Sequence, residues 1–124
     1  MNIVDSSGWL EFFVDGPNAT KFAGPLKETD KLIVPSICMY EVFKLVLRER
    51  GEHQALQAVA VMQKGTVIDL NPRVAMTAAR LSIAHSLPMA DSVILATARI
   101  TDAVIWTQDA DFKGLDCVKY FEKK

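Results

Sequence analysis

Short runs of apolar residues alternate along the chain with longer segments of helical spacing. The apolar runs are continuous and rich in β-branched residues, which is typical of strands buried on both faces of a sheet. They predict strands at 2–5, 32–34, 66–70 and 103–106, with an edge strand at 118–121. The segments between them predict helices at 8–15, 36–50, 52–64, 72–86 and 88–100, and shorter helical pieces within 18–30. This alternation indicates βαβ units, so we expect an α/β fold whose central, mostly parallel sheet is covered by helices on both faces.

Glycine and proline mark the expected ends of these elements. Gly16-Pro17 ends the first helix, and Gly24-Pro25 is expected to break the segment that follows it. Ser36 is a good N-cap for the long helix at 36–50, and Gly51 stands at its C′ position. No linker or repeat interrupts the pattern, so we expect residues 1–124 to form one domain.

Composition and charge narrow the class of protein. Half of the residues are apolar, which is enough for a sizeable core. Fourteen basic and fifteen acidic residues give a net charge of −1, which excludes a polycationic chain that binds nucleic acid through excess charge alone. Cys38 and Cys117 lack the spacing of a zinc ribbon or a disulfide scaffold. With no signal-peptide pattern and no apolar run near the roughly 20 residues that cross a bilayer, we expect a cytoplasmic protein with no membrane partner.

Acidic residues stand where parallel sheets bind ligands, outside the carboxyl ends of the strands. Asp5 comes directly after the first strand, where it can either cap the next helix or belong to an active site. Asp91 lies near the start of the helix at 88–100, on the face that continues through Ile94 and Leu95. An inward carboxylate costs several kcal/mol unless it is paired or metal-bound, although capping by the first helical turn is an alternative here.

The helix at 36–50 is apolar on almost every side except for one narrow stripe. Glu41, Lys44 and Arg48 form this stripe, because Lys44 and Arg48 follow Glu41 by three and seven residues. The stripe is either a solvated edge with a Glu41–Lys44 ion pair or the lining of a cleft.

Two further acids, Asp109 and Asp111, follow the strand at 103–106. An EF-hand loop is excluded, because Lys113 and Tyr120 stand where that loop requires calcium ligands. A solvated turn is the alternative to a functional role.

The acids that follow different strands can meet at one edge of the sheet. Four carboxylates within a few ångströms repel one another strongly unless a cation lies between them. Oxygen ligands without histidine or cysteine favour Mg²⁺ or Mn²⁺ over zinc. Such an ion binds phosphate oxygens and activates water for attack on a phosphodiester. The four acids are Asp5, Glu41, Asp91 and Asp109.

The whole chain resembles the PIN-domain family, of the kind found as VapC toxins in bacterial and archaeal toxin–antitoxin pairs. The order and spacing of several motifs carry the resemblance, and the Pro-x-Ala-Asp segment is the most specific of them. The motifs are Val4-Asp5-Ser6-Ser7-Gly8-Trp9, Tyr40-Glu41-Val42, Leu87-Pro88-Met89-Ala90-Asp91-Ser92 with Ile94 and Ala96-Thr97-Ala98, and Thr107-Gln108-Asp109-Ala110-Asp111-Phe112.

The resemblance implies a three-layer α/β/α fold and a magnesium-dependent ribonuclease with a quartet of acids. By motif, Asp5, Asp91 and Asp109 are the expected metal ligands, with Mn²⁺ able to replace Mg²⁺. Glu41 completes the catalytic quartet and binds metal through water or positions the nucleophile. Ser6 and Thr107 are the hydroxyl positions beside the metal, with helix capping and strand termination as their alternatives. Asp111 is interpreted as structural, with Phe112 as a core anchor.

The resemblance also implies partners, namely an RNA substrate, a cognate VapB-like antitoxin protein and a second copy of the chain in a homodimer. Alternative functions are a catalytically silent PIN-like binding module, whose acids only cap helices, and an RNA-processing nuclease that is not a toxin. A phosphotransfer domain with Asp5 as nucleophile is less consistent with the sequence, because neither Asp-x-Asp nor a glycine-rich loop follows the first strand.

Overall fold

The computed structural model describes all residues from 1 to 124 and contains one five-stranded sheet. Every strand is parallel to its neighbours, in the order β3-β2-β1-β4-β5. The expected α/β fold class is therefore confirmed, and the predicted edge strand does join the sheet. The strands are β1 (Asn2–Val4), β2 (Leu32–Pro35), β3 (Thr66–Ile68), β4 (Val104–Thr107) and β5 (Val118–Tyr120).

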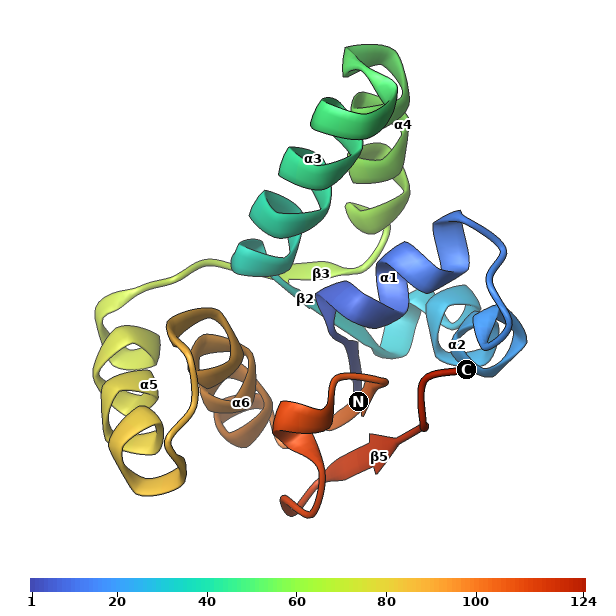
Figure 1. Cartoon of the computed structure of the whole chain (residues 1–124). Helices are drawn as coiled ribbons and strands as arrows, with labels where there is room; N and C mark the ends of the chain where they lie inside the picture. The colour runs from blue at the N-terminus through green and yellow to red at the C-terminus, as the bar shows by residue number, and fades with distance from the viewer.

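Six α-helices and two short 3₁₀ turns connect the strands. Figure 1 shows the pair α5–α6 on one side of the sheet and α1–α2 on the other, with the α3–α4 hairpin extending beyond them. No single helix is long and apolar enough to span a membrane, and only the bent pair α5 and α6, at 114° to each other, meets the length and composition criteria together. The elements are α1 (Ser6–Phe13), α2 (Ala19–Lys27), η1 (Thr29–Lys31), α3 (Ser36–Arg50), α4 (Glu52–Met62), α5 (Pro72–His85), α6 (Met89–Thr101) and η2 (Ala110–Phe112).

The strand order creates a natural ligand site beside β1. From β1 the chain continues through α1 and α2 to β2, which lies on one side of β1, whereas β4 lies on its other side. In open α/β sheets, connections that leave in opposite directions open a crevice at the carboxyl ends of the two strands. The residues that follow Val4 and Thr107 therefore meet at this crevice.

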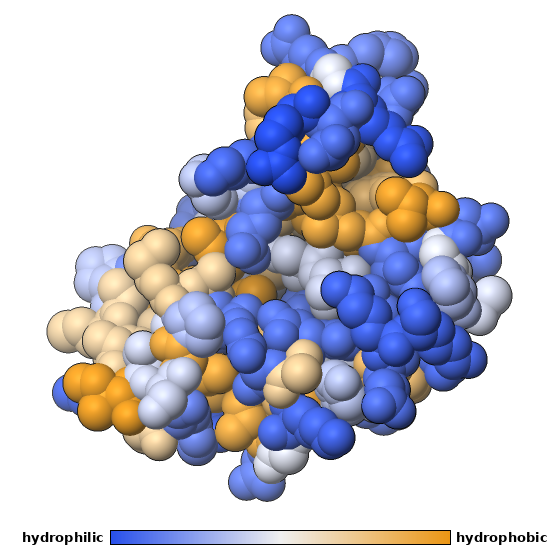
Figure 2. All heavy atoms as spheres, viewed as in Figure 1, coloured by the Kyte–Doolittle hydropathy of each residue, from blue (hydrophilic) through white to orange (hydrophobic).

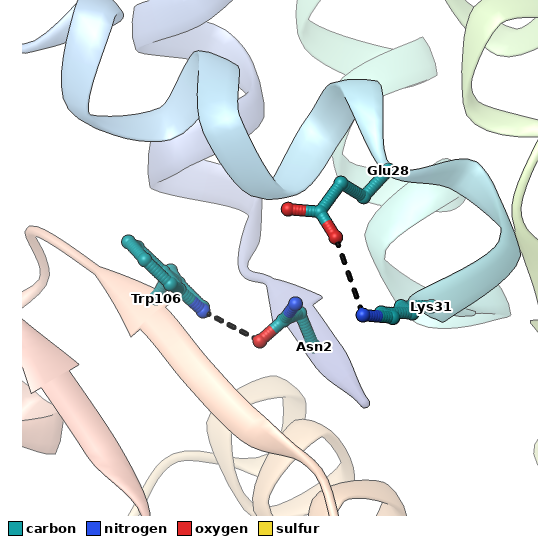
Figure 3. Close-up of polar contacts among 4 residues, drawn as sticks. All are labelled: Asn2, Glu28, Lys31 and Trp106. Carbon is teal, nitrogen blue, oxygen red and sulfur yellow. Dashed lines mark hydrogen bonds and ion pairs between the residues drawn. The ribbon is translucent and has the colours of Figure 1, made fainter.

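Apolar side chains of the central strands form the core. Ile3, Val34 and Ile105 are fully buried in one large cluster with side chains from the surrounding helices. Trp106, which the apolar run predicts to be a core residue, is only half-buried. Its indole Nε1 donates a hydrogen bond of 3.0 Å to Asn2 Oδ1 on the neighbouring strand (Figure 3).

Two predicted helix boundaries are wrong. α2 continues through Gly24-Pro25, although Pro25 lacks the N–H that would bond to the fourth residue before it. Pro25 and Leu26 are both buried, so packing of the last turn outweighs the lost hydrogen bond. Ser36 is the first helical residue of α3 and makes no capping bond, because Pro35 occupies the N-cap position.

Figure 3 also shows the ion pair between Glu28 and Lys31, which lies near the amino end of β2. The two charged atoms are 3.7 Å apart, and both side chains are more than half exposed. Exposed pairs of this kind add little to stability. The pair marks the edge of the sheet opposite to the crevice.

Candidate metal-binding site

Asp5 is a buried carboxylate held by three hydrogen bonds. Its Oδ1 accepts from Ser7 Oγ at 2.8 Å and from the Gly8 N–H at 3.1 Å, and its Oδ2 accepts from Thr107 Oγ1 at 2.7 Å. Burial raises the pKa of Asp5 to about 6, although the bonds from Thr107, Ser7 and Gly8 lower it, and the charge of Asp109 adds to the rise. Asp5 therefore caps α1 and also lies at the crevice, so its two sequence interpretations are compatible.

Thr107 connects two of the acids through its one hydroxyl group. It donates to Asp5 and accepts from the Asp109 N–H at 2.9 Å. Ser7 supports the same loop, because its hydroxyl accepts from the Gln108 N–H at 3.3 Å. The end of β4 and the start of α1 are thus joined by hydroxyl groups that position carboxylates.

Three carboxylates gather beside Asp5. One oxygen from each of Asp91, Asp109 and Asp111 lies within 4.8 Å of the others. Asp91 comes from the first turn of α6, whereas Asp109 caps η2 and accepts from the Asp111 N–H at 2.9 Å. This arrangement follows from the fold, because η2 turns directly after β4 and α6 begins at the same edge of the sheet.

The pKa of Asp91 is raised to about 8. Burial is the largest cause, followed by a hydrogen bond with the Asp111 carboxyl group and by repulsion from Asp109, Asp111 and Asp5. The carboxyl group of Asp91 therefore holds a proton near neutral pH when no cation is bound. A divalent cation would replace that proton and relieve the repulsion.

Glu41 reaches the crevice from the second turn of α3. Its Oε1 accepts a hydrogen bond of 2.6 Å from Ser6 Oγ. The expected alternative for this residue, an ion pair with Lys44, does not form; the ion pairs of the chain are Glu28–Lys31 and Arg48–Glu49. Ser6 thus holds Glu41 in the way that Ser7 and Thr107 hold Asp5.

Cys38 lies one helical turn before Glu41 and is fully buried. Burial raises the pKa of its thiol well above the usual range, and the charges of Asp5, Glu41 and Asp91 contribute to the rise. Three carboxylates from separate parts of the chain thus all act on one buried side chain, as expected if they lie on the same side of the fold.

The structure places the predicted site residues at one crevice. The three carboxylates that lie closest together are not the three predicted metal ligands. Asp5, Asp91 and Asp109 are the predicted metal ligands, whereas the tightest group consists of Asp91, Asp109 and Asp111. Asp111, interpreted from sequence as structural, joins this group because η2 turns its carboxylate back toward Asp91. Phe112 next to it is fully buried, as expected of a core anchor.

The donor set fits a hard divalent cation. The clustered donors are carboxylate oxygens, and no histidine or cysteine of the chain belongs to the group. Mg²⁺ and Mn²⁺ prefer such oxygen ligands. A bound cation would remove the repulsion between carboxylates that contributes to the raised pKa of Asp91.

Residues 3–116 match the PIN domain family. The chain therefore belongs to the PIN-domain family, whose α/β fold it has. No curated protein matches the sequence.

Several solved structures share this fold at low sequence identity. A chain of a toxin–antitoxin complex from Klebsiella pneumoniae is 19% identical, with a TM-score of 0.83 and coverage of 99% of this chain and 100% of that one. VapC20 from Mycobacterium tuberculosis, described as a toxin that cleaves the sarcin–ricin loop, is 15% identical, with a TM-score of 0.77 and coverage of 94% and 95%. A chain of the DNA-bound VapBC complex from Salmonella typhimurium is 14% identical, with a TM-score of 0.72 and coverage of 98% of both chains.

Proposed function

We propose that this protein is a Mg²⁺-dependent endoribonuclease and the toxin of a VapBC-like toxin–antitoxin pair. The observation that carries the proposal is the meeting of carboxylates from β1, α3, α6 and η2 at one crevice, inside a PIN domain. Toxin complexes among the structural neighbours support the toxin role. We also propose that residues 1–124 form one domain and that the protein acts in the cytoplasm.

Each residue of the crevice has a role in this proposal. Asp5, Asp91 and Asp109 would hold the cation, with Asp5 on the buried side of the crevice and Asp111 as a supporting carboxylate next to Asp91. The chemistry that a bound divalent cation supplies is activation of water and neutralisation of phosphate charge. Glu41, oriented by Ser6, accepts a proton from the attacking water, while Thr107 keeps Asp5 and Asp109 in register.

The nuclease activity is tested with purified wild-type protein and two variants, Asp91→Asn and Asp109→Asn. The wild type should cleave RNA with Mg²⁺ or Mn²⁺ and lose this activity in EDTA, and both variants should lose it with either metal. Mn²⁺ should also raise the Tm of the wild type but not of Asp91→Asn, because a ligand that binds only the folded state stabilises it. Asp116→Asn, which changes an exposed acid that does not belong to the cluster, is the matched control and should behave as wild type.

The activity assay also separates this proposal from its alternatives. A protein that binds no Mn²⁺ and cleaves no RNA would be a silent binding module. Cleavage of RNA without growth arrest on expression would indicate an RNA-processing nuclease instead of a toxin. Growth arrest that disappears in Asp91→Asn supports the toxin role.

An apolar groove between α1 and the α3–α4 hairpin is the proposed binding site of the antitoxin. The groove has a volume of about 260 Å³, and Figure 2 shows hydrophobic side chains in the recess between these helices. Its apolar lining with polar groups at the rim suits an amphipathic segment of a partner. The lining residues include Leu10, Phe13, Val46, Arg50, Gln54 and Val61.

The antitoxin is tested by co-expression with the neighbouring reading frame. Val61→Asp places a charge in the groove and should abolish both co-purification and relief of growth arrest, with cleavage of RNA unchanged. Gln63→Asp adds the same charge just after α4 and serves as the control.

A second copy of the chain is proposed to cover the exposed apolar side chains of α5 and α6. Ile83 is 86% exposed and Met89 is 70% exposed, and Met76 is also mostly exposed. Large exposed apolar patches mark interaction sites in soluble proteins. Sedimentation should give a dimer for the wild type and a monomer for Ile83→Asp, whereas a monomeric wild type would contradict the homodimer.

A further inference from the structure

One face of α3 carries exposed aromatic and basic side chains beside Glu41. Tyr40, Lys44 and Arg48, here called the α3 strip, line a shallow pocket of about 180 Å³ together with Glu41 and Leu45. Tyr40 is 57% exposed, which is unusual for so large an aromatic side chain. The sequence left two interpretations of the stripe Glu41, Lys44 and Arg48, a solvated edge or the lining of a cleft. In the structure these residues line a pocket, and Glu41 also belongs to the crevice.

Lys44 lies next to the tyrosine and has no acidic partner. Its Nζ is 3.5 Å from Tyr40 Oη and 5.5 Å from the centre of the ring. Glu41 stands one turn before it but is hydrogen-bonded to Ser6. The ammonium group of Lys44 is therefore available to an anion that approaches the pocket.

Arg48 extends the strip by one more turn. Its only ion pair, at 3.2 Å, is with Glu49, the next residue, and both side chains are mostly exposed. Exposed pairs of this kind are weak, so an incoming phosphate can replace Glu49 at little cost. The strip therefore offers two cations and one aromatic ring, all directed away from the core.

We propose that the α3 strip binds the single-stranded RNA substrate next to the scissile bond, with Tyr40 stacked on one base and with Lys44 and Arg48 bound to backbone phosphates. This inference rests on the proposed ribonuclease function and assigns three substrate-binding residues outside the acidic cluster. It also explains how a chain with a net charge of −1 can hold a polyanion, because the positive charge is concentrated along one track.

The spacing along the helix agrees with a nucleotide strand that leads away from the crevice. At 1.5 Å per residue, Lys44 lies about 4.5 Å and Arg48 about 10 Å beyond Glu41 along the axis of α3. Phosphates of a stacked strand are about 3.4 Å apart along its axis, so Arg48 lies about three nucleotides from the carboxylates. The α3 strip is therefore long enough to contact about three nucleotides of the RNA strand.

An aromatic platform selects unpaired nucleotides. A base can stack on the Tyr40 ring only when it has left its own helix, since bases in duplex RNA are stacked on each other and their major groove is narrow. Stacking tolerates every base, because each has a flat π face. The strip therefore predicts a preference for single strands over duplexes with little preference for sequence.

The strip is tested by binding of a fluorescent single-stranded RNA of about 12 nucleotides, within the usual range of such sites, measured by anisotropy in EDTA so that no cleavage occurs. Tyr40→Ala should weaken binding about tenfold, whereas Tyr40→Phe retains the ring and should bind nearly as wild type. Lys44→Ala and Arg48→Ala should each weaken binding and reduce the slope of log K against log salt by about 0.7. Lys27→Ala, an exposed cation near the amino end of β2, should change neither quantity.

Cleavage kinetics provide the second measurement. Strip variants should raise KM with kcat nearly unchanged, since they remove binding that is equal in ground and transition states. The same RNA annealed to its complement should bind wild type about tenfold more weakly than the single strand and should be insensitive to Tyr40→Ala.

The outcomes separate the strip from the nuclease proposal. A wild type that cleaves RNA in a metal-dependent way while Tyr40→Ala and the charge variants bind RNA normally overturns the strip and leaves the nuclease intact. Equal losses in Tyr40→Ala and Tyr40→Phe overturn the stacking role. If Tyr40→Ala instead weakens binding of the antitoxin or the second copy, the surface belongs to a protein partner and the proposal is wrong.

Discussion

A carboxylate oxygen of Asp91 lies within 4.8 Å of one of Asp111, although both side chains are negative when ionised. At this distance the two charges repel each other unless one group holds a proton or a cation lies between them. Burial and the neighbouring acids favour that proton on Asp91, whose pKa is about 8. Without metal, Asp91 therefore holds a proton at the place where the proposed function requires a cation. We expect protons and divalent cations to compete for this carboxyl group.

The first prediction concerns stability in the absence of metal. The pKa of Asp91 rises from an ordinary 3.8 to about 8 on folding, and that of Asp5 rises to about 6. The folded state thus binds these protons more tightly than the unfolded state, so their contribution to stability is complete below about pH 4 and is lost as the pH rises through about 8. The Tm in EDTA should fall between about pH 5 and pH 8.

Asp91→Asn should give a flatter profile of Tm against pH, because asparagine cannot release the proton. Asp116→Asn removes an exposed acid outside the cluster and should retain the slope of the wild type. Saturating Mg²⁺ should also flatten the wild-type profile. Identical slopes for wild type and Asp91→Asn would show that the proton on Asp91 does not affect folding.

The second prediction assigns Asp111 to the metal site. Asp111→Asn removes one of the three clustered carboxylates and should weaken Mn²⁺ binding by about tenfold or more, as loss of a ligand's supporting group does. It also removes a negative neighbour from Asp91, so the pKa of Asp91 should fall and the loss of stability should end at lower pH. Titration of Mn²⁺ by calorimetry and Tm profiles measure the two effects. Unchanged Mn²⁺ affinity would contradict a role in metal binding and support the structural role expected from the sequence.

Most of the fold could be predicted because local signals agree with one another. Asn71 accepts from the Val74 N–H at 2.9 Å and Pro72 begins α5, as their sequence positions indicate. Gly51 follows the last residue of α3 with a φ of 90°, which suits glycine. The break expected at Gly24-Pro25 is wrong, because burial of Pro25 depends on contacts between distant segments that a local pattern does not contain.

The site was less accessible to sequence reasoning for the same reason. The strand order brings the ends of β1 and β4 together, whereas the alternation of strands and helices predicts only that parallel strands end on the same side of the sheet. The conformation of η2 brings both Asp109 and Asp111 close to Asp91. The sequence pattern does not predict this conformation. The Asp109-x-Asp111 spacing was the available signal, since a capping aspartate that accepts from the N–H two residues later turns the chain tightly.

The third prediction tests the hydroxyl that joins Asp5 to Asp109. Thr107→Val has nearly the same shape but removes the donor to Asp5 and the acceptor for the Asp109 N–H. We expect a loss of about 1–3 kcal/mol in the free energy of unfolding, a further rise in the pKa of Asp5 and weaker Mn²⁺ binding. Thr107→Ser retains the hydroxyl and should preserve metal binding. Equal Mn²⁺ affinities for the two variants would mean that the hydroxyl does not position the carboxylates.

The last prediction concerns the close packing under the start of α1. A Cβ at Gly8 would lie 2.5 Å from Val4 Cγ1 and 2.9 Å from two atoms of the Phe22 ring, all of them buried. Gly8→Ala should therefore lower the free energy of unfolding by about 1–3 kcal/mol, as overpacking of a core does. The variant should also weaken Mn²⁺ binding, because the Gly8 N–H donates to Asp5 and moves with the helix.

Gly24→Ala is the matched control for that substitution. Gly24 also lies inside a helix, but a Cβ there would meet nothing within 4 Å. Alanine favours helix over glycine by about 1 kcal/mol, but a Cβ directly before Pro25 disfavours the helical conformation, so the two effects oppose each other and this variant should have nearly the stability of the wild type. Denaturant unfolding compares the two variants directly. A loss of stability in Gly8→Ala well beyond that of Gly24→Ala would report the contact of Gly8 with Val4 and Phe22, and equal stabilities would show that α1 can shift without cost to the core.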